Sequence, residues 1–195
     1  MPRRLLAVVA VLFALAGCAS TPPAPIRTGG PANGPWSDAA PAVAGGKTGP
    51  GTACPQALTF DVPAGWKLTG DFTAVGGLTL GGLDLVCELD GKPAGVLGIM
   101  RVFKGATGDL RAIGARYVAD WAPTATEVEY RDAKVGPADG VEISFRSLDH
   151  YTRDFLVESG PTVYLVDWGG LDSDAHTAGL PAYVLARTSA VVTTG

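Results

Sequence analysis

The stretch Leu58-Thr59-Phe60-Asp61-Val62-Pro63-Ala64-Gly65-Trp66 is the part of the sequence that best defines the fold. Apolar and polar residues alternate over 58–62, which is the period of a half-buried β-strand. Pro63-Ala64-Gly65 is a turn signal, and the apolar residues Trp66 and Leu68 follow it. The stretch therefore predicts two short strands joined as a hairpin at the start of a folded domain.

Strand signals continue beyond this opening. Residues 83–89 and 94–103 predict two strands around the turn Asp90-Gly91-Lys92-Pro93. Before them, Gly76-Gly77-Leu78-Thr79-Leu80 is nearly copied by Gly81-Gly82-Leu83-Asp84-Leu85. Neither glycine pair is followed by a helix start and a lysine, so the pattern does not favour a phosphate-binding loop. We expect strand ends or bulges at these glycines.

The hydrophobic period then changes to that of a helix, with Asp109 or Thr107 as a candidate N-cap and Pro123 beyond the end. The apolar residues on one helical face are Leu110, Ile113, Tyr117 and Trp121. Three strands, at 141–146, 151–158 and 162–168, are predicted to follow as a meander.

A helical stripe closes the chain within 173–192, with Asp172 or Ser173 as a candidate cap. Because Gly179 and Pro181 weaken its first half, the sequence predicts a helix over 181–192. Helices and strands are segregated rather than alternating. The predicted fold class is therefore α+β, an antiparallel sheet with one or two helices packed on it.

The opening stretch also resembles a known family pattern. It matches the "F-x-V/L-P-x-G-W" opening of small exported proteins with the Mog1/PsbP-like fold, to which many actinobacterial lipoproteins belong. The order of elements is similar too: an opening hairpin, further strands, a helix, a three-stranded meander and a closing helix. The resemblance implies this fold and a habit of binding partners or assisting complexes. It transfers no catalytic residue.

The N-terminus has the pattern of an export signal. Arg3 and Arg4 precede an apolar run over 5–15, which is too short to span a bilayer. The run ends in Leu15-Ala16-Gly17-Cys18, which resembles the lipobox of bacterial lipoproteins. The resemblance implies that the signal peptide 1–17 is removed and that Cys18 receives acyl chains, with palmitate expected among them. The protein would then be held at the extracytoplasmic face of the cell membrane, after Sec or twin-arginine export.

Residues 18–53 are predicted to be the lipidated cysteine and a disordered tether, and 54–195 a single globular domain. Seven prolines and seven glycines fall within 19–53, and no apolar periodicity is present. Trp36 stands out in this segment. We interpret it as incidental, with a membrane or partner contact as the alternative.

Two cysteines remain after lipidation, Cys54 and Cys87. In an exported protein an even pair predicts a disulfide, and two separate buried thiols are the alternative. A zinc site is not supported, since zinc requires four ligands and the chain has neither a Cys-x-x-Cys motif nor a histidine pair.

Charge limits the possible partners. Without residues 1–17 the chain carries 13 basic and 19 acidic groups, a net charge of about −6. This balance argues against nucleic-acid binding. Contact with the membrane is therefore expected through the acyl chains.

The sequence offers few candidates for catalysis. His150 and His176, together with Asp172 and Asp174, are the residues from which a metal or acid–base site would have to be built. The polar residues 172–176 are better interpreted as a helix start, where acids face the positive end of the helix dipole. We predict no catalytic residue, no metal and no cofactor.

Seven aromatic residues suit a core or a ligand cleft, and the core interpretation is favoured because most follow the apolar phase of their elements. They are Trp66, Tyr117, Trp121, Phe145, Phe155, Tyr164 and Trp168. Trp168 precedes Gly169-Gly170 and is the exception, with a position at a cleft rim expected.

Together these features predict a lipid-anchored, non-enzymatic binding or accessory module for another envelope component. Two alternatives remain open. One is a carrier of a lipid or other apolar ligand, and the other is a hydrolase acting on cell-wall material, with a cluster at 149–153 or 172–176.

Overall fold

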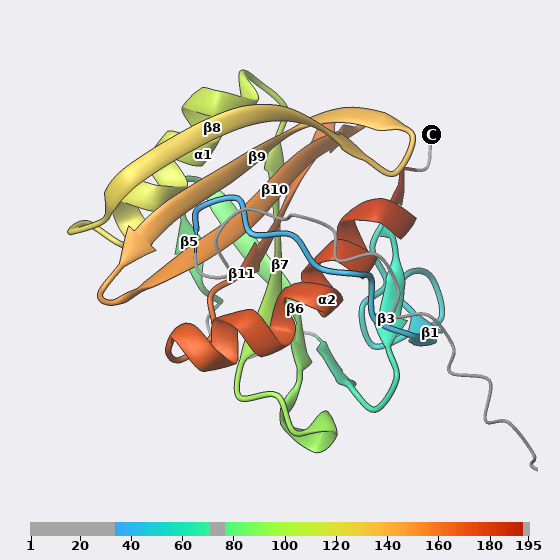
Figure 1. Ribbon diagram of the computed structural model, residues 1–195. Coiled ribbons are helices and arrows are strands. Elements are labelled where there is room, and N and C mark those ends of the chain that lie inside the picture. Colours follow the sequence, from blue (N-terminus) through green and yellow to red (C-terminus); the bar gives the residue numbers. More distant parts are fainter. Residues whose placement is uncertain (1–33, 71–76, 193–195) are drawn as a thin grey trace, which may run out of the picture.

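The computed structural model describes residues 34–70 and 77–192 (Figure 1). The predicted signal peptide, the lipobox and Cys18 lie outside the described residues. The helices are α1 (Leu110–Trp121) and α2 (Ser173–Ser189), and a 3₁₀ turn spans Lys92–Ala94. The strands are β1 (Ala44–Lys47), β2 (Leu58–Thr59), β3 (Asp61–Pro63), β4 (Lys67–Gly70), β5 (Thr79–Leu80), β6 (Leu83–Asp90), β7 (Ile99–Ala106), β8 (Thr126–Val135), β9 (Ala138–Ser147), β10 (His150–Ser159), β11 (Thr162–Trp168) and β12 (Val191–Val192).

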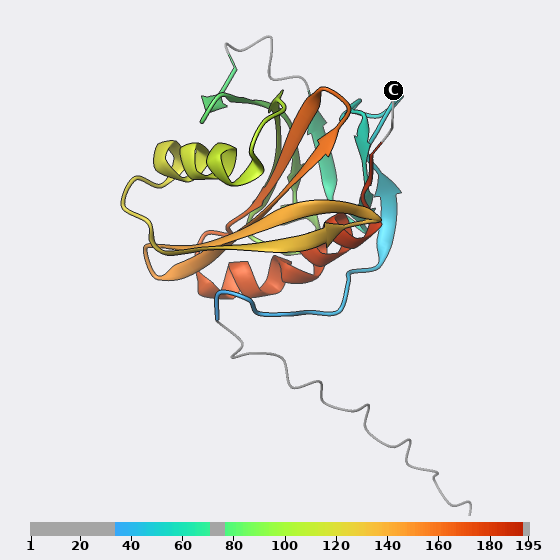
Figure 2. The ribbon, with the colours of Figure 1, turned by 90° about the horizontal axis from the view of Figure 1, so that it is seen from above.

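An eight-stranded antiparallel sheet organises the domain, in the order β4-β6-β7-β11-β10-β9-β8 with β5 beside β6. The two helices cover opposite faces of this sheet (Figures 1 and 2). In β10, Phe155 and Val157 join the core under α2, whereas Leu156 joins the core under α1. The sheet is thus buried on both sides, and the predicted α+β class is confirmed.

The opening hairpin is the main correction to the predicted fold. The chain does turn at Pro63, where the amide of Trp66 donates to the Pro63 carbonyl over 3.2 Å. The two arms, however, pair elsewhere. β2 pairs with β12 and β3 with β1, while β4 joins the main sheet beside β6. Alternation predicted extended backbone correctly, but it carries no information on which strand supplies the partner.

The middle of the chain follows the predictions closely. Asp109 caps α1, its carboxylate accepting from the amide of Ala112 over 2.7 Å. The three predicted meander strands correspond to β9, β10 and β11. The long edge strand β8 was not predicted. Its side chains are mostly exposed, so it lacks a clear apolar alternation.

Helix α2 is longer than predicted and begins at Ser173, with Asp172 as its cap. Gly179 does not break it, because the indole of Trp168 lies directly against the helix at that point. A Cβ on Gly179 would come within 1.8 Å of the Trp168 ring. The glycine is therefore a packing requirement, since no other residue allows this approach.

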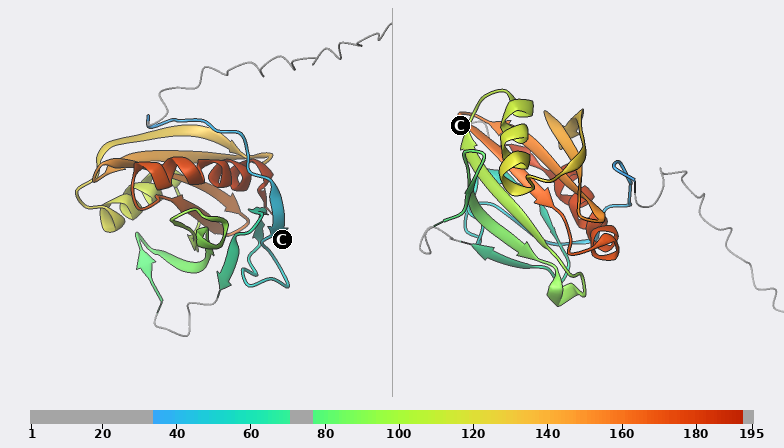
Figure 3. Two further views of the ribbon diagram at one scale, coloured as in Figure 1. Left: turned by 60° about the horizontal axis from the view of Figure 1, so that its bottom comes forward. Right: turned by 90° about the vertical axis from the view of Figure 1, so that its left-hand side faces the viewer.

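The predicted tether boundary at residue 53 is wrong, because residues 34–53 fold against the domain. β1 pairs with β3, and the amide of Ala42 donates to the carbonyl of Pro181 in α2 over 2.9 Å. We call residues 34–43 the strap; it runs along α2 towards β1 (Figure 3). Composition missed it because proline and glycine also suit an extended chain that is held by hydrogen bonds to another element.

The predicted disulfide is present. Cys54 and Cys87 are both buried and are bonded, with their Cα atoms 5.5 Å apart. The bond links the segment before β2 to the central strand β6 and so fixes the opening stretch to the main sheet.

Candidate binding cleft

A cleft of about 620 Å³ opens where β7 and β10 begin and β9 and β11 end. Eight large apolar side chains are exposed in the described residues, and four of them line this cleft. They are Leu97, Trp121, Leu148 and Leu171, with exposed fractions of 54%, 37%, 86% and 71%. Each comes from a different connection or helix end, so the fold gathers them at one place. An exposed apolar group of this kind marks an interaction site more often than scattered single residues do.

Leu148 has a backbone conformation that its side chain disfavours. It is the first of two residues between β9 and β10, and its φ is +59°. Glycine is the usual residue for such a position in a two-residue hairpin. For a leucine the left-handed conformation costs about 1–2 kcal/mol. The chain therefore holds a strained, largely exposed leucine at the mouth of the cleft, and such strain concentrates at functional sites.

A row of charged side chains crosses four strands beneath the cleft, on the face covered by α1. Strand register places Glu88 opposite Arg101, Arg101 opposite Asp167, and Asp167 opposite Asp154. We call these four residues the charged row. Arg101 Nε donates to Glu88 Oε1 over 3.0 Å, and Arg101 Nη1 lies 3.5 Å from Asp167 Oδ2. The same guanidinium lies over the ring of Trp121, 5.1 Å from its centroid.

Burial changes the protonation of this row. Burial, reinforced by the neighbouring Asp167 carboxylate, holds the pKa of Asp154 well above its ordinary value. Burial also raises the pKa of Asp167, although Arg101 opposes the shift. Tyr117 of α1 is close by, and burial keeps its pKa well above 10, so it stays protonated. Two buried carboxylates that face each other cannot both ionise without cost, so these shifts favour a pair that holds one proton at pH values where a free aspartate is ionised.

The structure brings together the two histidines that the sequence singled out. The rings of His150 and His176 lie 6.5 Å apart beside a second hollow of about 230 Å³. Burial lowers the pKa of His176 to about 4, so its ring is neutral at neutral pH. The nearby Ser173 hydroxyl donates to the Asp149 carbonyl, not to a histidine.

The interpretation of residues 172–176 as a helix start is confirmed. Asp172 accepts from the amide of Ala175 over 2.8 Å, and Asp174 lies in the first turn of α2. Across residues 34–70 and 77–192, no group of three or more His, Cys, Asp or Glu side chains is arranged to hold a metal ion. In the same ranges, neither helix combines the length and apolarity needed to cross a membrane.

Trp168 is not at a rim, contrary to the prediction. It is fully buried, and its indole Nε1 donates to the carbonyl of His176 over 3.0 Å. The residue follows Tyr164 and Val166 on the α2 face of β11, so its own phase directs it into the core. The two glycines after it serve the turn that leads to α2. The aromatic residue at the cleft is instead Trp121, which the sequence assigned to the core.

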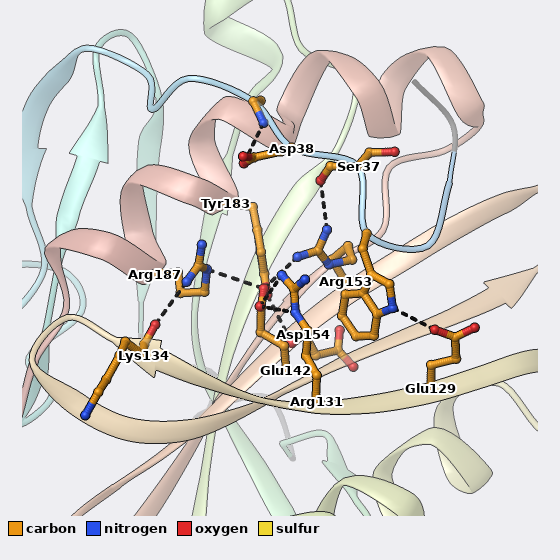
Figure 4. Close-up of polar contacts among 12 residues, drawn as sticks. Ser37, Asp38, Glu129, Arg131, Lys134, Glu142, Arg153, Asp154, Tyr183 and Arg187 are labelled. Atoms are coloured by element: carbon orange, nitrogen blue, oxygen red, sulfur yellow. Dashed lines mark hydrogen bonds and ion pairs between the residues drawn. The ribbon is translucent and has the colours of Figure 1, made fainter. Parts of the chain in front are cut away.

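A second polar cluster lies on the opposite face of the sheet, under the strap (Figure 4). Its centre is Glu142, whose carboxylate is paired with Arg153 at 2.6 Å, with Arg131 at 2.6 Å and with Arg187 at 3.3 Å. The Tyr183 hydroxyl donates to it over 2.8 Å. Burial alone would raise the pKa of Glu142, but these partners hold it below its ordinary value.

Trp36 covers this cluster and is not incidental. Its ring stacks on Arg131 and Arg153, with guanidinium carbons 4.2 and 5.0 Å from the centroid. Its indole Nε1 donates to Glu129 over 2.6 Å. Cation–π contacts of this kind stabilise by about 0.5–2 kcal/mol. The cluster fastens the strap to the domain, and we assign it a structural role.

The sequence patterns did not predict most of the residues that line the cleft. Leu97, Leu148 and Leu171 lie in loops, where a single leucine carries no signal. The signal that was available is an acid inside an apolar strand, as at Asp154 and Asp167, because a carboxylate is rarely placed in a core without a reason.

Comparison with known proteins supports this description of the fold. No curated protein sequence matches the chain. Among solved structures the chain is similar to cyanobacterial PsbP (CyanoP) from Synechocystis sp. PCC 6803, with a TM-score of 0.50 and 13% identity over 70% of this chain and 87% of that one. At this identity the similarity concerns the fold alone, and it confirms the PsbP-like architecture. A family model described as an uncharacterised lipoprotein matches residues 28–190. The chain therefore belongs to this family of lipoproteins.

Proposed function

We propose that the protein is a lipid-anchored accessory module at the extracytoplasmic face of the cell membrane, where its cleft binds an apolar segment of another envelope protein. Membership of a lipoprotein family and the Leu15-Ala16-Gly17-Cys18 motif support the anchor. The observation that carries the binding role is the convergence of four exposed apolar side chains on one cleft, including Leu148 in a strained conformation. A leucine that is 86% exposed gains little from folding, so its retention is better explained by a partner.

The carrier alternative is less favoured because of where the apolar groups are. A carrier encloses its ligand in an apolar interior, whereas Leu148 and Leu171 extend into solvent at the mouth of the cleft. A native mass spectrum of protein purified from its own envelope would distinguish the two. Extra mass of a few hundred daltons that leaves on denaturation would support a carrier, and a bound polypeptide would support the accessory module.

The hydrolase alternative depends on His150 and His176. Replacing both with alanine would abolish a cell-wall activity if they were catalytic. Folded variants that still support the cellular role of the protein would dismiss this alternative.

Site-specific crosslinking in the native envelope tests the proposed function. A photoreactive residue at position 148 is expected to give a discrete crosslinked species with a second protein. The same group at Asp139, a largely exposed residue just after the turn between β8 and β9, is the matched control. Equal patterns at both positions, or no product at 148 in lipidated protein, would overturn the proposal.

A further inference from the structure

We infer that the cleft is selective for a basic side chain within an apolar segment, and that Asp167 binds the cationic group. This inference rests on the proposed function, because it names the chemistry of the segment that the cleft would hold.

A buried carboxyl group without a well-placed donor lies in the lining of the cleft. Asp167 is 1% exposed and lines the cleft, and in the described part of the chain no donor reaches either of its oxygens in good hydrogen-bond geometry, although Arg101, Tyr117 and Asp154 lie close enough to influence its pKa. Buried polar groups are normally hydrogen-bonded, so an unpartnered one requires an explanation. A donor supplied by a ligand would meet this need, and a cationic donor would meet it best.

Arg101 does not fill this role. Its Nε is bonded to Glu88, and its Nη1 lies 3.5 Å from Asp167, beyond a good N–H···O distance. The guanidinium also lies over Trp121, which fixes it at the side of the cleft. With one guanidinium against Glu88, Asp154 and Asp167, the row has an excess of carboxylates. A cation entering the cleft therefore meets a favourable field, and an anion an unfavourable one.

The rim suits the stem of such a side chain. Lysine and arginine pack their methylene groups on apolar surface while the charged end contacts a polar group. Leu97, Leu148 and Trp121 supply that surface around the acidic lining. The other titratable groups lining the cleft are Asp90, Lys92 and His150. Asp90 and Lys92 have opposite charges, so they do not reverse the preference for a cation.

Binding is also expected to displace a proton. The Asp154–Asp167 pair keeps a proton because both carboxyls are buried. A cation beside Asp167 favours full ionisation of the pair, so the affinity should rise with pH, by up to about tenfold per unit for one released proton.

Three peptides test the inference by NMR titration: acetyl-Leu-Lys-Leu-amide and its counterparts with norleucine or glutamate in place of lysine. The protein is the chain from residue 18 onwards with Cys18→Ser, which keeps every described residue. We expect the lysine peptide to shift the Trp121 indole signal and to bind at least about 10-fold more tightly than the norleucine peptide, as for a charge-assisted hydrogen bond. Its affinity should rise from pH 5 to pH 7, and that of the norleucine peptide should not.

Single substitutions test whether Asp167 causes the preference for the lysine peptide. Asp167→Asn should reduce lysine-peptide affinity to that of the norleucine peptide, while Asp139→Asn, with the same charge change at the far end of the sheet, should change neither. Asp154→Asn should keep the lysine preference and lose its pH dependence, which separates charge recognition from a folding defect. Equal binding of the lysine and norleucine peptides would overturn the inference and leave the proposed function standing. Preference for glutamate, or no shift at Trp121 with any peptide, would also overturn it, and the crosslinking result then decides the proposed function independently.

Discussion

The retained proton makes a measurable prediction for stability, with Asp154→Asn as the perturbation. Asp154 is fully buried opposite Asp167, and the neighbouring Asp167 carboxyl group contributes to the rise in the pKa of Asp154. Asparagine has the same shape and cannot ionise, and its amide can donate to the Asp167 carboxylate as a protonated Asp154 would. The variant should therefore keep the native packing while removing the titration.

The direction in which the free energy of unfolding changes with pH follows from the difference in proton binding between the folded and unfolded states. A carboxyl whose pKa is raised in the folded state binds a proton that the unfolded chain releases above a pH of about 4. Folding stability is then lost as pH rises, by about 1.4 kcal/mol per pH unit, until the folded-state pKa is reached. His176 acts in the opposite direction, because burial lowers its pKa to about 4. Its contribution is lost as pH falls below its ordinary value of about 6.5. Between pH 4 and 6.5 the two slopes oppose each other in the wild type.

The difference between variant and wild type isolates the acid pair, because the His176 contribution cancels. The free energy of unfolding, measured in urea from pH 5 to pH 7, should rise with pH in Asp154→Asn relative to wild type, with a slope of at most about 1.4 kcal/mol per pH unit. Asp139→Asn, which removes a surface ion pair with Lys134 at 2.6 Å, should shift stability by less than about 1 kcal/mol and without this slope. A constant difference between Asp154→Asn and wild type across the range would show that the pair holds no extra proton.

Three further predictions concern the other features of the fold. Leu148→Gly should leave the free energy of unfolding unchanged or raise it by up to about 1 kcal/mol, because the backbone strain is relieved. The same variant should no longer bind the partner protein in the envelope. A clear loss of stability would contradict the strain at Leu148. Trp36→Ala should lower the free energy of unfolding by about 1–3 kcal/mol and increase hydrogen exchange in residues 34–43. Trp36→Phe should lose less stability, because an aromatic ring remains over the arginines. Equal exchange in the wild type and both variants would mean that Trp36 does not hold the strap. Replacing Cys54 and Cys87 with serine should cost about 3–4 kcal/mol for a loop of 33 residues, measured by denaturant unfolding against oxidised wild type, and an equal loss on adding reductant to the wild type should accompany it.

Local patterns predicted the elements more reliably than their partners. The apolar face of α1, its Asp109 cap and the meander β9–β11 all depend on neighbouring residues, and these predictions are confirmed. For the opening stretch, the predicted strand pairing is wrong. Its extended segments are real, but β3 pairs with a strand that composition had assigned to a tether. Pairing between distant segments is decided by the whole core, which a local period does not encode.

The cleft was harder to predict because it belongs to no single element. Leu97, Leu148 and Leu171 come together only when three connections meet at one end of the sheet. The charged row needs the register of four strands, since Glu88 and Asp167 are far apart in sequence. Asp154 and Asp167 were visible as acids within apolar strands. Without the register, however, nothing indicated that they face each other.

A comparison of the two buried polar clusters supports a binding role for the excess of carboxyl groups over arginines beneath the cleft. Around Glu142 a single carboxylate is paired with three arginines and a tyrosine, so its charge is fully compensated. In the row beneath the cleft, one arginine is paired with Glu88 and Asp167, and Asp154 faces Asp167 without an arginine of its own in the row. Both clusters lie in the same sheet at similar depth, so the fold is able to compensate a buried carboxylate. Leaving the second cluster short of positive charge costs stability, because its buried carboxyl groups must either stay protonated or carry an uncompensated charge. The shortage occurs in the cluster that reaches an open cleft, where a partner can supply the missing cation.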